Sequence, residues 1–131
     1  MLVQFLLLHL YRFKYINMKK KKIVYVFESD EHGMLIGDSA IIAKNEYGAQ
    51  CGAGNGLTGQ AYAIPTLDMF GDKLSIGEIK FYISKFITYA ENHPRRNFIV
   101  SKIGTSRYGL TEQESIDLFS AFDIPKNVEL L

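Results

Sequence analysis

The chain has 131 residues, of which 47% are hydrophobic and 22% are charged. This length fits one domain, and the composition excludes collagen-like, low-complexity and wholly disordered proteins. A single cysteine, Cys51, excludes an intramolecular disulfide framework and leaves no cysteine pair with zinc spacing. The sequence therefore predicts a cytoplasmic protein without a bound metal or cofactor.

The net charge of +1 hides an uneven distribution of charge along the chain. Residues 1–22 carry six bases and no acid, whereas the remaining 109 residues hold nine bases against fourteen acids. Because an acidic domain repels phosphates, we expect no nucleic-acid partner.

The N-terminal residues 1–22 are predicted to form an extension outside the domain. The apolar residues 1–11 are fewer than the ~20 that span a bilayer, and they lack the order of a signal peptide. We expect neither a membrane span nor secretion. Met18 resembles a natural start of translation, so residues 1–17 are interpreted as an upstream-start artefact or a loose extension. The alternative is a short strand or helix that packs or touches a membrane.

The first predicted elements are a strand and a short helix. Residues 23–27 form a β-branched and aromatic run, which is typical of a strand buried on both faces. Asp38 or Ser39 can cap a helix that runs to about residue 44, with Gly48 near its end.

A glycine-dense segment, residues 48–59, follows this helix and holds five of the eleven glycines. We interpret it as an anion-contacting loop or as a hairpin-like connection. Residues 54–59 match GxGxxG, but the match precedes a strand, which argues against a Rossmann fold. Residues 60–64 are predicted as a second buried strand that ends at Pro65, because proline lacks an N–H donor.

Two capping boxes mark the helices of the second half. Ser75 and Glu78 begin a helix that ends before Pro94, and Thr111 and Glu114 begin another. The inward-facing residues expected in the second helix region are Ile116, Leu118, Phe119 and Phe122.

Strand patterns at residues 97–103 and 128–131 complete a single α/β domain, residues 23–131, with a mostly parallel sheet. Ligands of such sheets bind outside the carboxyl ends of the strands. Three loops are predicted there: residues 28–37, the residues from Pro65 onward, and residues 104–110.

Several residues of these loops have both a chemical and a structural interpretation. Asp30, Glu31 and His32 could bind a metal or supply a general base, but a solvated loop fits three adjacent residues better. Ser29 and Ser39 lack the G-x-S-x-G frame of a nucleophile, and helix capping explains Ser39.

Three residues outside the first loop also have both a chemical and a structural interpretation. Cys51 could be a reactive thiol, although a small buried apolar residue is favoured. Arg107 is either a bidentate phosphate ligand or a surface arginine. Tyr108 either stacks on a base or packs.

Four blocks of the sequence resemble a family of small, mostly uncharacterised bacterial and phage proteins with a macro-domain-like pattern. Residues 26–30 (V-F-E-S-D) correspond to V-F-G-S-N, and residues 37–40 (G-D-S-A) to a glycine-alanine helix start. Residues 52–66 match G-x-G-x-G-L-x-G-Q-x-Y-A-I-P-T, and residues 103–109 (I-G-T-S-R-Y-G) correspond to I-G-C-G-x-x-G. The resemblance runs from about residue 23 to the end.

The resemblance implies a three-layer, macro-domain-like α/β fold with a mostly parallel mixed sheet. It also implies a cleft for ADP-ribose or a related nucleotide and, if the protein is active, hydrolysis of an ADP-ribosyl bond, with Asp30 and loop amides positioning the ribose. No catalytic nucleophile is predicted. The implied ligand-binding residues are Ser29, Asp30, Gly37, Asp38, Gly54, Gly56, Gly59, Gly104, Thr105, Ser106, Arg107, Tyr108 and Gly109.

Three positions depart from the family pattern at this cleft. Glu28 and Ser106 replace glycines, and Asp30 replaces asparagine. Glu28 and Asp30 add negative charge where a diphosphate would lie. The alternative function is therefore a non-enzymatic structural or interaction module of phage or prophage type, with a vestigial cleft and a protein partner.

Overall fold

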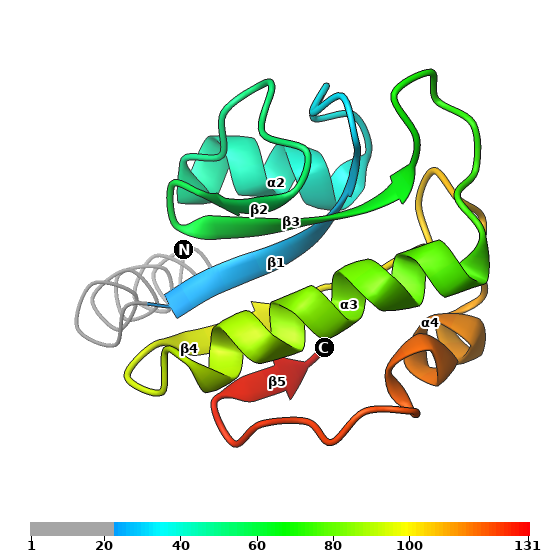
Figure 1. Cartoon of the computed structure of the whole chain (residues 1–131). Helices are drawn as coiled ribbons and strands as arrows, with labels where there is room; N and C mark the ends of the chain where they lie inside the picture. Colours follow the sequence, from blue (N-terminus) through cyan, green and yellow to red (C-terminus); the bar gives the residue numbers. More distant parts are fainter. Residues whose placement is uncertain (1–22) are drawn as a thin grey trace, which may run out of the picture.

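The computed structural model describes residues 23–131, so the predictions about residues 1–22 lie outside the described residues. The described chain forms five strands and three helices (Figure 1). In chain order these are β1 (Ile23–Asp30), α2 (Asp38–Tyr47), β2 (Gly56–Thr58), β3 (Ala61–Leu67), α3 (Ile76–Glu91), β4 (Asn97–Val100), α4 (Glu112–Phe119) and β5 (Val128–Leu130).

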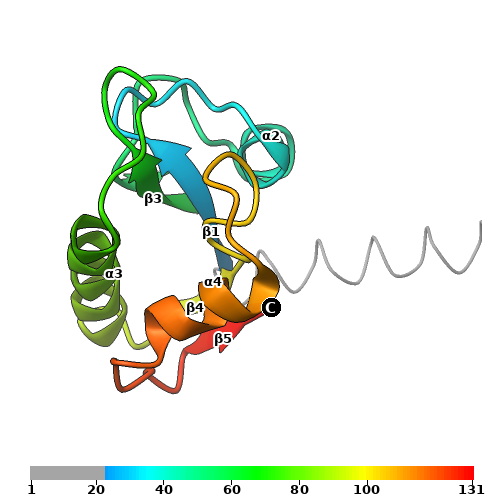
Figure 2. The same cartoon turned by 90° about the vertical axis from the view of Figure 1, so that its right-hand side faces the viewer.

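The strands form one sheet in the order β2-β3-β1-β4-β5. β1 runs parallel to β3 and β4, and β4 runs parallel to β5, whereas β2 and β3 are antiparallel. Helix α2 covers one face of the sheet, and α3 and α4 cover the other (Figure 2). The prediction of a three-layer α/β fold with a mostly parallel mixed sheet is confirmed.

Each face of the sheet has its own apolar core because side chains alternate along a strand. Val24 and Val26 of β1 face α3 and α4, in the larger core. Tyr25 and Phe27 face α2, where Tyr25 stacks on Tyr47 with ring centroids 4.8 Å apart. The buried positions of α2 in this smaller core are otherwise alanines, which allow the helix to lie close to the strands.

Several predicted strand ends are wrong, and β4, for example, ends at Val100 and not at residue 103. β1 continues to Asp30, and β3 continues through Pro65 to Leu67. β2 pairs only with residues 61–63 of β3. On that side β3 pairs again only at its end, where Leu67 pairs with Lys73 and the Thr66 carbonyl accepts from the N–H of Leu74. Pro65 lies between these two paired stretches, where a proline is tolerated because no ladder partner needs its missing N–H.

Both capping boxes and the left-handed Gly48 at the end of α2 are confirmed. The predicted side-chain cap of α2 is wrong. Gly37 is the N-cap residue, without a side-chain cap bond, and the Ser39 hydroxyl accepts a hydrogen bond from the N–H of Glu28 (3.2 Å). Ile116 is also 52% exposed instead of facing inward, because the inner face of α4 is formed by Ser115, Leu118 and Phe119.

The glycine-dense segment ends in a hairpin, since β2 pairs with β3. Cys51, expected to be buried, is exposed in the turn before β2. Within residues 23–131, no helix has the length and apolar character needed to cross a membrane.

Candidate functional site

The carboxyl end of β1 lies at the centre of three loops. β1 is the middle strand, and β3 and β4 flank it in parallel. The loops after these three strands therefore converge around residues 28–30, as expected for a parallel sheet. Glu28, Ser29 and Asp30 are all buried, with 3%, 3% and 2% of their surface exposed.

The Glu28 carboxylate is bound by the loop that follows β4. Oε1 accepts hydrogen bonds from the backbone N–H groups of Gly104 (3.0 Å) and Ser106 (3.1 Å). Oε2 accepts from the Thr66 hydroxyl (2.8 Å) and from the N–H of Tyr108 (3.2 Å). We call these four donors the Glu28 cradle. Converging backbone N–H groups are a recurrent way to bind an anion, and here the anion is a side chain of the same chain.

The cradle depends on the conformation of its loop. Gly104 has a φ of +87°, and a Cβ atom there would lie 2.6 Å from Cδ1 of Leu110. Glycine is therefore required at this position. The loop is closed by the N–H of Leu110, which donates to the Gly104 carbonyl (2.8 Å), and by the Tyr108 hydroxyl, which donates to the Leu74 carbonyl (2.8 Å).

Asp30 forms a second carboxylate cluster beside the first. Its Oδ1 accepts from the N–H groups of Gly33 (2.6 Å) and Met34 (3.2 Å). Its Oδ2 forms an ion pair with Arg107. Burial opposes ionisation of Asp30, but the hydrogen bonds from Arg107, Met34 and Gly33, together with the Arg107 charge, lower its pKa below the ordinary value of 3.8.

The remaining contacts fill the space between the loops. The Ser29 hydroxyl donates to the Gly54 carbonyl (2.5 Å). A Cβ atom on Gly37 would lie 2.9 Å from the Ser106 hydroxyl, so the loop before α2 and the loop after β4 are in contact. The loops around the carboxyl end of β1 are therefore joined to one another by contacts within the chain itself.

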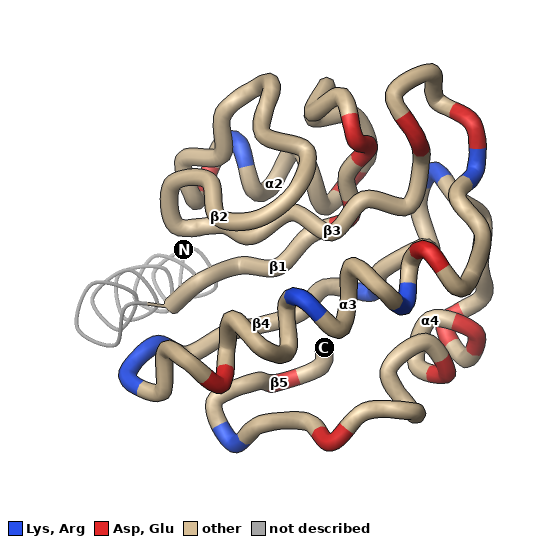
Figure 3. The backbone as a smooth tube through the Cα atoms, viewed as in Figure 1, with Lys and Arg blue, Asp and Glu red and all other residues tan. Residues whose placement is uncertain are grey.

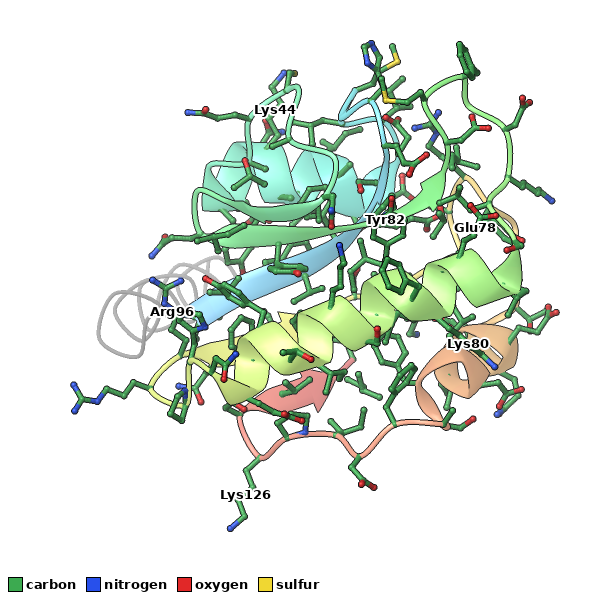
Figure 4. All side chains as sticks on the ribbon, viewed as in Figure 1. Lys44, Glu78, Lys80, Tyr82, Arg96 and Lys126 are labelled. Atoms are coloured by element: carbon green, nitrogen blue, oxygen red, sulfur yellow. The ribbon has the colours of Figure 1, made fainter. Side chains whose placement is uncertain are left out.

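Glu31 and Tyr82 join the first loop to α3. The Tyr82 hydroxyl donates to Oε2 of Glu31, and Figure 4 shows Tyr82 directed from α3 toward the sheet. This hydrogen bond, with burial and the negative charges of Glu31 and Glu78, raises the pKa of Tyr82 to about 12.

The structure brings most of the predicted site residues together, but not all. Gly56 lies within the edge strand β2, and a side chain on Gly59 would contact the carbonyl of Gly48, at the end of α2 and far from the carboxyl end of β1. Asp38 is an exposed first residue of α2. The predicted residues that meet around β1 are Ser29, Asp30, Gly37, Gly54, Gly104, Ser106, Arg107 and Tyr108, with Thr105 and Gly109 in the same loop.

Asp30, Glu31 and Tyr108 each have specific partners in the structure. Asp30, Glu31 and His32 point to different partners, since Asp30 pairs with Arg107, Glu31 accepts from Tyr82, and His32 is exposed. No group of three metal-binding side chains gathers anywhere in the described part of the chain. Tyr108 packs against the larger core, and the Lys73 ammonium lies 5.1 Å from its ring centroid.

The sequence did not indicate the roles of Glu28 and Thr66 as partners. The available signal was the position of Glu28, a carboxylate within a buried apolar strand, because such a charge requires donors.

No protein-family model matches the chain, and neither does any curated protein sequence.

Proposed function

We propose that this protein is a non-enzymatic interaction module of macro-like architecture, whose anion-binding loop is occupied by its own Glu28 carboxylate. The observation that carries the proposal is the Glu28 cradle, in which three backbone N–H groups and one hydroxyl donate to a single buried side chain. These are the groups that a diphosphate would need.

The energetics support an occupied cleft. A phosphate could use the loop amides only after displacing Glu28, and the displaced carboxylate would lose charge-assisted hydrogen bonds worth roughly 1.5–3 kcal/mol each. Glu28 and Asp30 would then face the phosphate. The repulsion between two unit charges 4 Å apart costs about 1 kcal/mol in water and about 4 kcal/mol near a protein surface. Arg107 is already paired with Asp30, and the Lys73 ammonium lies over the ring of Tyr108.

Binding of an ADP-ribose-type nucleotide is the second candidate. It is favoured by the resemblance and by the geometry of the loop, because amides that hold a carboxylate are also suited to a phosphate oxygen. Replacing Glu28 by glycine, as in the family pattern, would free the three amides. Replacing Asp30 by asparagine would weaken its hold on Arg107.

Isothermal titration separates the two candidates. ADP-ribose, AMP and NAD are titrated into the wild-type protein and into the Glu28→Gly, Asp30→Asn double variant, with Glu91→Gln, an exposed position on α3, as control. We expect no saturable heat from the wild type or the control, and saturable ADP-ribose binding by the double variant. Saturable binding of ADP-ribose by the wild type would refute the occupied-cleft proposal. Circular dichroism establishes that each variant is folded.

A further inference from the structure

The loop between β3 and α3 exposes a large aromatic side chain on a hydrogen-bonded backbone. Phe70 is 91% exposed. Asp68 Oδ1 accepts from the N–H groups of Phe70 (2.8 Å) and Asp72 (2.9 Å), and the Asp68 N–H donates to the Asp72 carbonyl (2.8 Å). Because these hydrogen bonds hold the backbone around Phe70, the loop loses little freedom on binding, and exposed aromatic residues are typical interface anchors.

The surface around Phe70 carries apolar and acidic side chains, and the one base of the same loop, Lys73, lies over the ring of Tyr108. Met69, next to Phe70, is 54% exposed, and Met34, in the loop after β1, is 53% exposed. The two loops leave neighbouring parallel strands, and the N–H of Glu31 donates to the Leu67 carbonyl (2.9 Å). Figure 3 shows acidic residues along both loops. We define the acidic edge as Met34, Met69 and Phe70 with the carboxylates Glu31, Asp68 and Asp72.

Basic residues lie at the opposite end of the sheet, where the parallel strands begin. Arg95 and Arg96 immediately precede β4, and Lys126 lies just before β5, so all three lie where parallel strands begin (Figures 3 and 4). Ile23, the first residue of β1, pairs with Asn97. Lysines 19–22 directly precede Ile23 in the sequence, and the apolar stretch of residues 1–11 lies further toward the N-terminus.

Chain geometry prevents these lysines from reaching the acidic edge of their own molecule. Lys19 can lie at most about 14 Å from Ile23 along an extended chain. The eight residues of β1 that separate the two edges span about 26 Å. The acidic edge of a second copy has no such restriction.

We propose that residues 1–22 of one copy bind the acidic edge of a second copy, with Phe70 against the apolar residues and the carboxylates near the lysines. This inference rests on the proposed function in assigning the protein an interaction role, and it names the partner. The contact joins two different surfaces, so it builds head-to-tail chains unless a ring closes.

Sedimentation velocity of the full-length protein over a range of concentrations tests this proposal. We expect self-association at low ionic strength that is lost at high salt, because exposed charges are screened beyond about 3 Å in 1 M salt. Phe70→Ser should weaken association about tenfold or more, and Asp72→Asn should weaken it in the same direction. Ile116→Ser, which removes an exposed apolar residue on α4, is the matched control and should associate like the wild type.

Three results would overturn the proposal. They are a wild-type protein that stays monomeric at every salt concentration, a Phe70→Ser variant that associates as tightly as the wild type, and association that survives replacement of lysines 19–22 by glutamine. The last result, combined with loss of association in Phe70→Ser, would indicate that two acidic edges bind each other. Nucleotide titration tests the proposed function, and sedimentation tests the contact between copies. Either proposal can therefore be refuted without the other.

Discussion

The backbone N–H of Gly104 donates to Oε1 of Glu28 at 3.0 Å, across 76 positions of the sequence. This hydrogen bond joins the central strand β1 to the loop after β4. The donor is a loop amide and the acceptor is a buried carboxylate. The hydrogen bond therefore holds the loop in place and at the same time offsets the free energy that burial of the charge costs. The stability of the domain and the state of the cleft therefore depend on the same side chain.

Replacing Glu28 by glutamine should destabilise the fold by about 2 kcal/mol. The amide group of glutamine offers one accepting oxygen where the carboxylate offers two, so one pair of donors in the Glu28 cradle is left facing an NH₂ group. Urea unfolding of Glu28→Gln measures this loss. Glu91→Gln makes the same chemical change at an exposed position and should leave the unfolding free energy within about 0.5 kcal/mol of the wild type. Equal stability of both variants would contradict the role of the cradle.

The sequence predicted the elements that local chemistry specifies and missed those that distant contacts specify. The boxes Ser75 to Glu78 and Thr111 to Glu114 operate within four residues, so their helices could be recognised from sequence alone. The partners of the Glu28 carboxylate lie 38 to 80 positions away, and no local pattern encodes them.

Two errors have the same origin. Ser39 has the residue type of a helix cap, but its hydroxyl accepts from the N–H of Glu28 in β1. Pro65 has the residue type of a strand end, but the short β2 leaves that part of β3 unpaired on one side. Both outcomes depend on which strand lies alongside, and this is set by the tertiary fold.

Removal of Arg107 should cost stability that depends on pH. Arg107→Ala leaves the buried Asp30 carboxylate without its ion pair, and losing one partner of such a pair costs about 3 kcal/mol. The pKa of Asp30 is lowered in the fold, so its contribution is present above 3.8 and is lost as the pH falls below that value. The difference between wild type and Arg107→Ala should therefore be large at neutral pH and shrink below pH 3.8.

Chemical unfolding at a series of pH values measures this difference. Lys102→Ala is the control, because Lys102 and Glu112 form an ion pair of 2.8 Å in which both side chains are exposed. Its removal should cost less than about 1 kcal/mol. A cost for Arg107→Ala that is equally small, or that stays constant between pH 7 and pH 3, would argue against a stabilising Asp30 pair.

Tyr82 should ionise at unusually high pH because its hydroxyl donates to Glu31. The pKa of Tyr82 is raised to about 12, so the folded state favours the neutral phenol. This contribution to stability is complete below pH 10 and is lost as the pH rises toward 12. Subtracting the ultraviolet titration of Tyr82→Phe from that of the wild type isolates this residue, and the difference should titrate near 12. In Glu31→Gln the same difference should move to lower pH. A Tyr82 that titrates near 10 in both backgrounds would exclude the hydrogen bond.

A comparison of alanine substitutions at Gly104 and Gly71 distinguishes the cost of backbone strain from the cost of a steric clash. Their φ angles are +87° and +86°, but a Cβ atom on Gly104 would meet Leu110 at 2.6 Å, whereas Gly71 has no neighbouring atom within 4 Å of that position. Gly71→Ala should cost only the left-handed conformation, about 1–2 kcal/mol. Gly104→Ala should cost a further 1–3 kcal/mol, roughly the penalty for overpacking. Thermal or urea unfolding of the two variants measures the difference. An equal loss of unfolding free energy in the two variants would mean that Leu110 moves aside freely. It would also mean that the loop tolerates a shift of the Gly104 N–H group, which donates to Glu28.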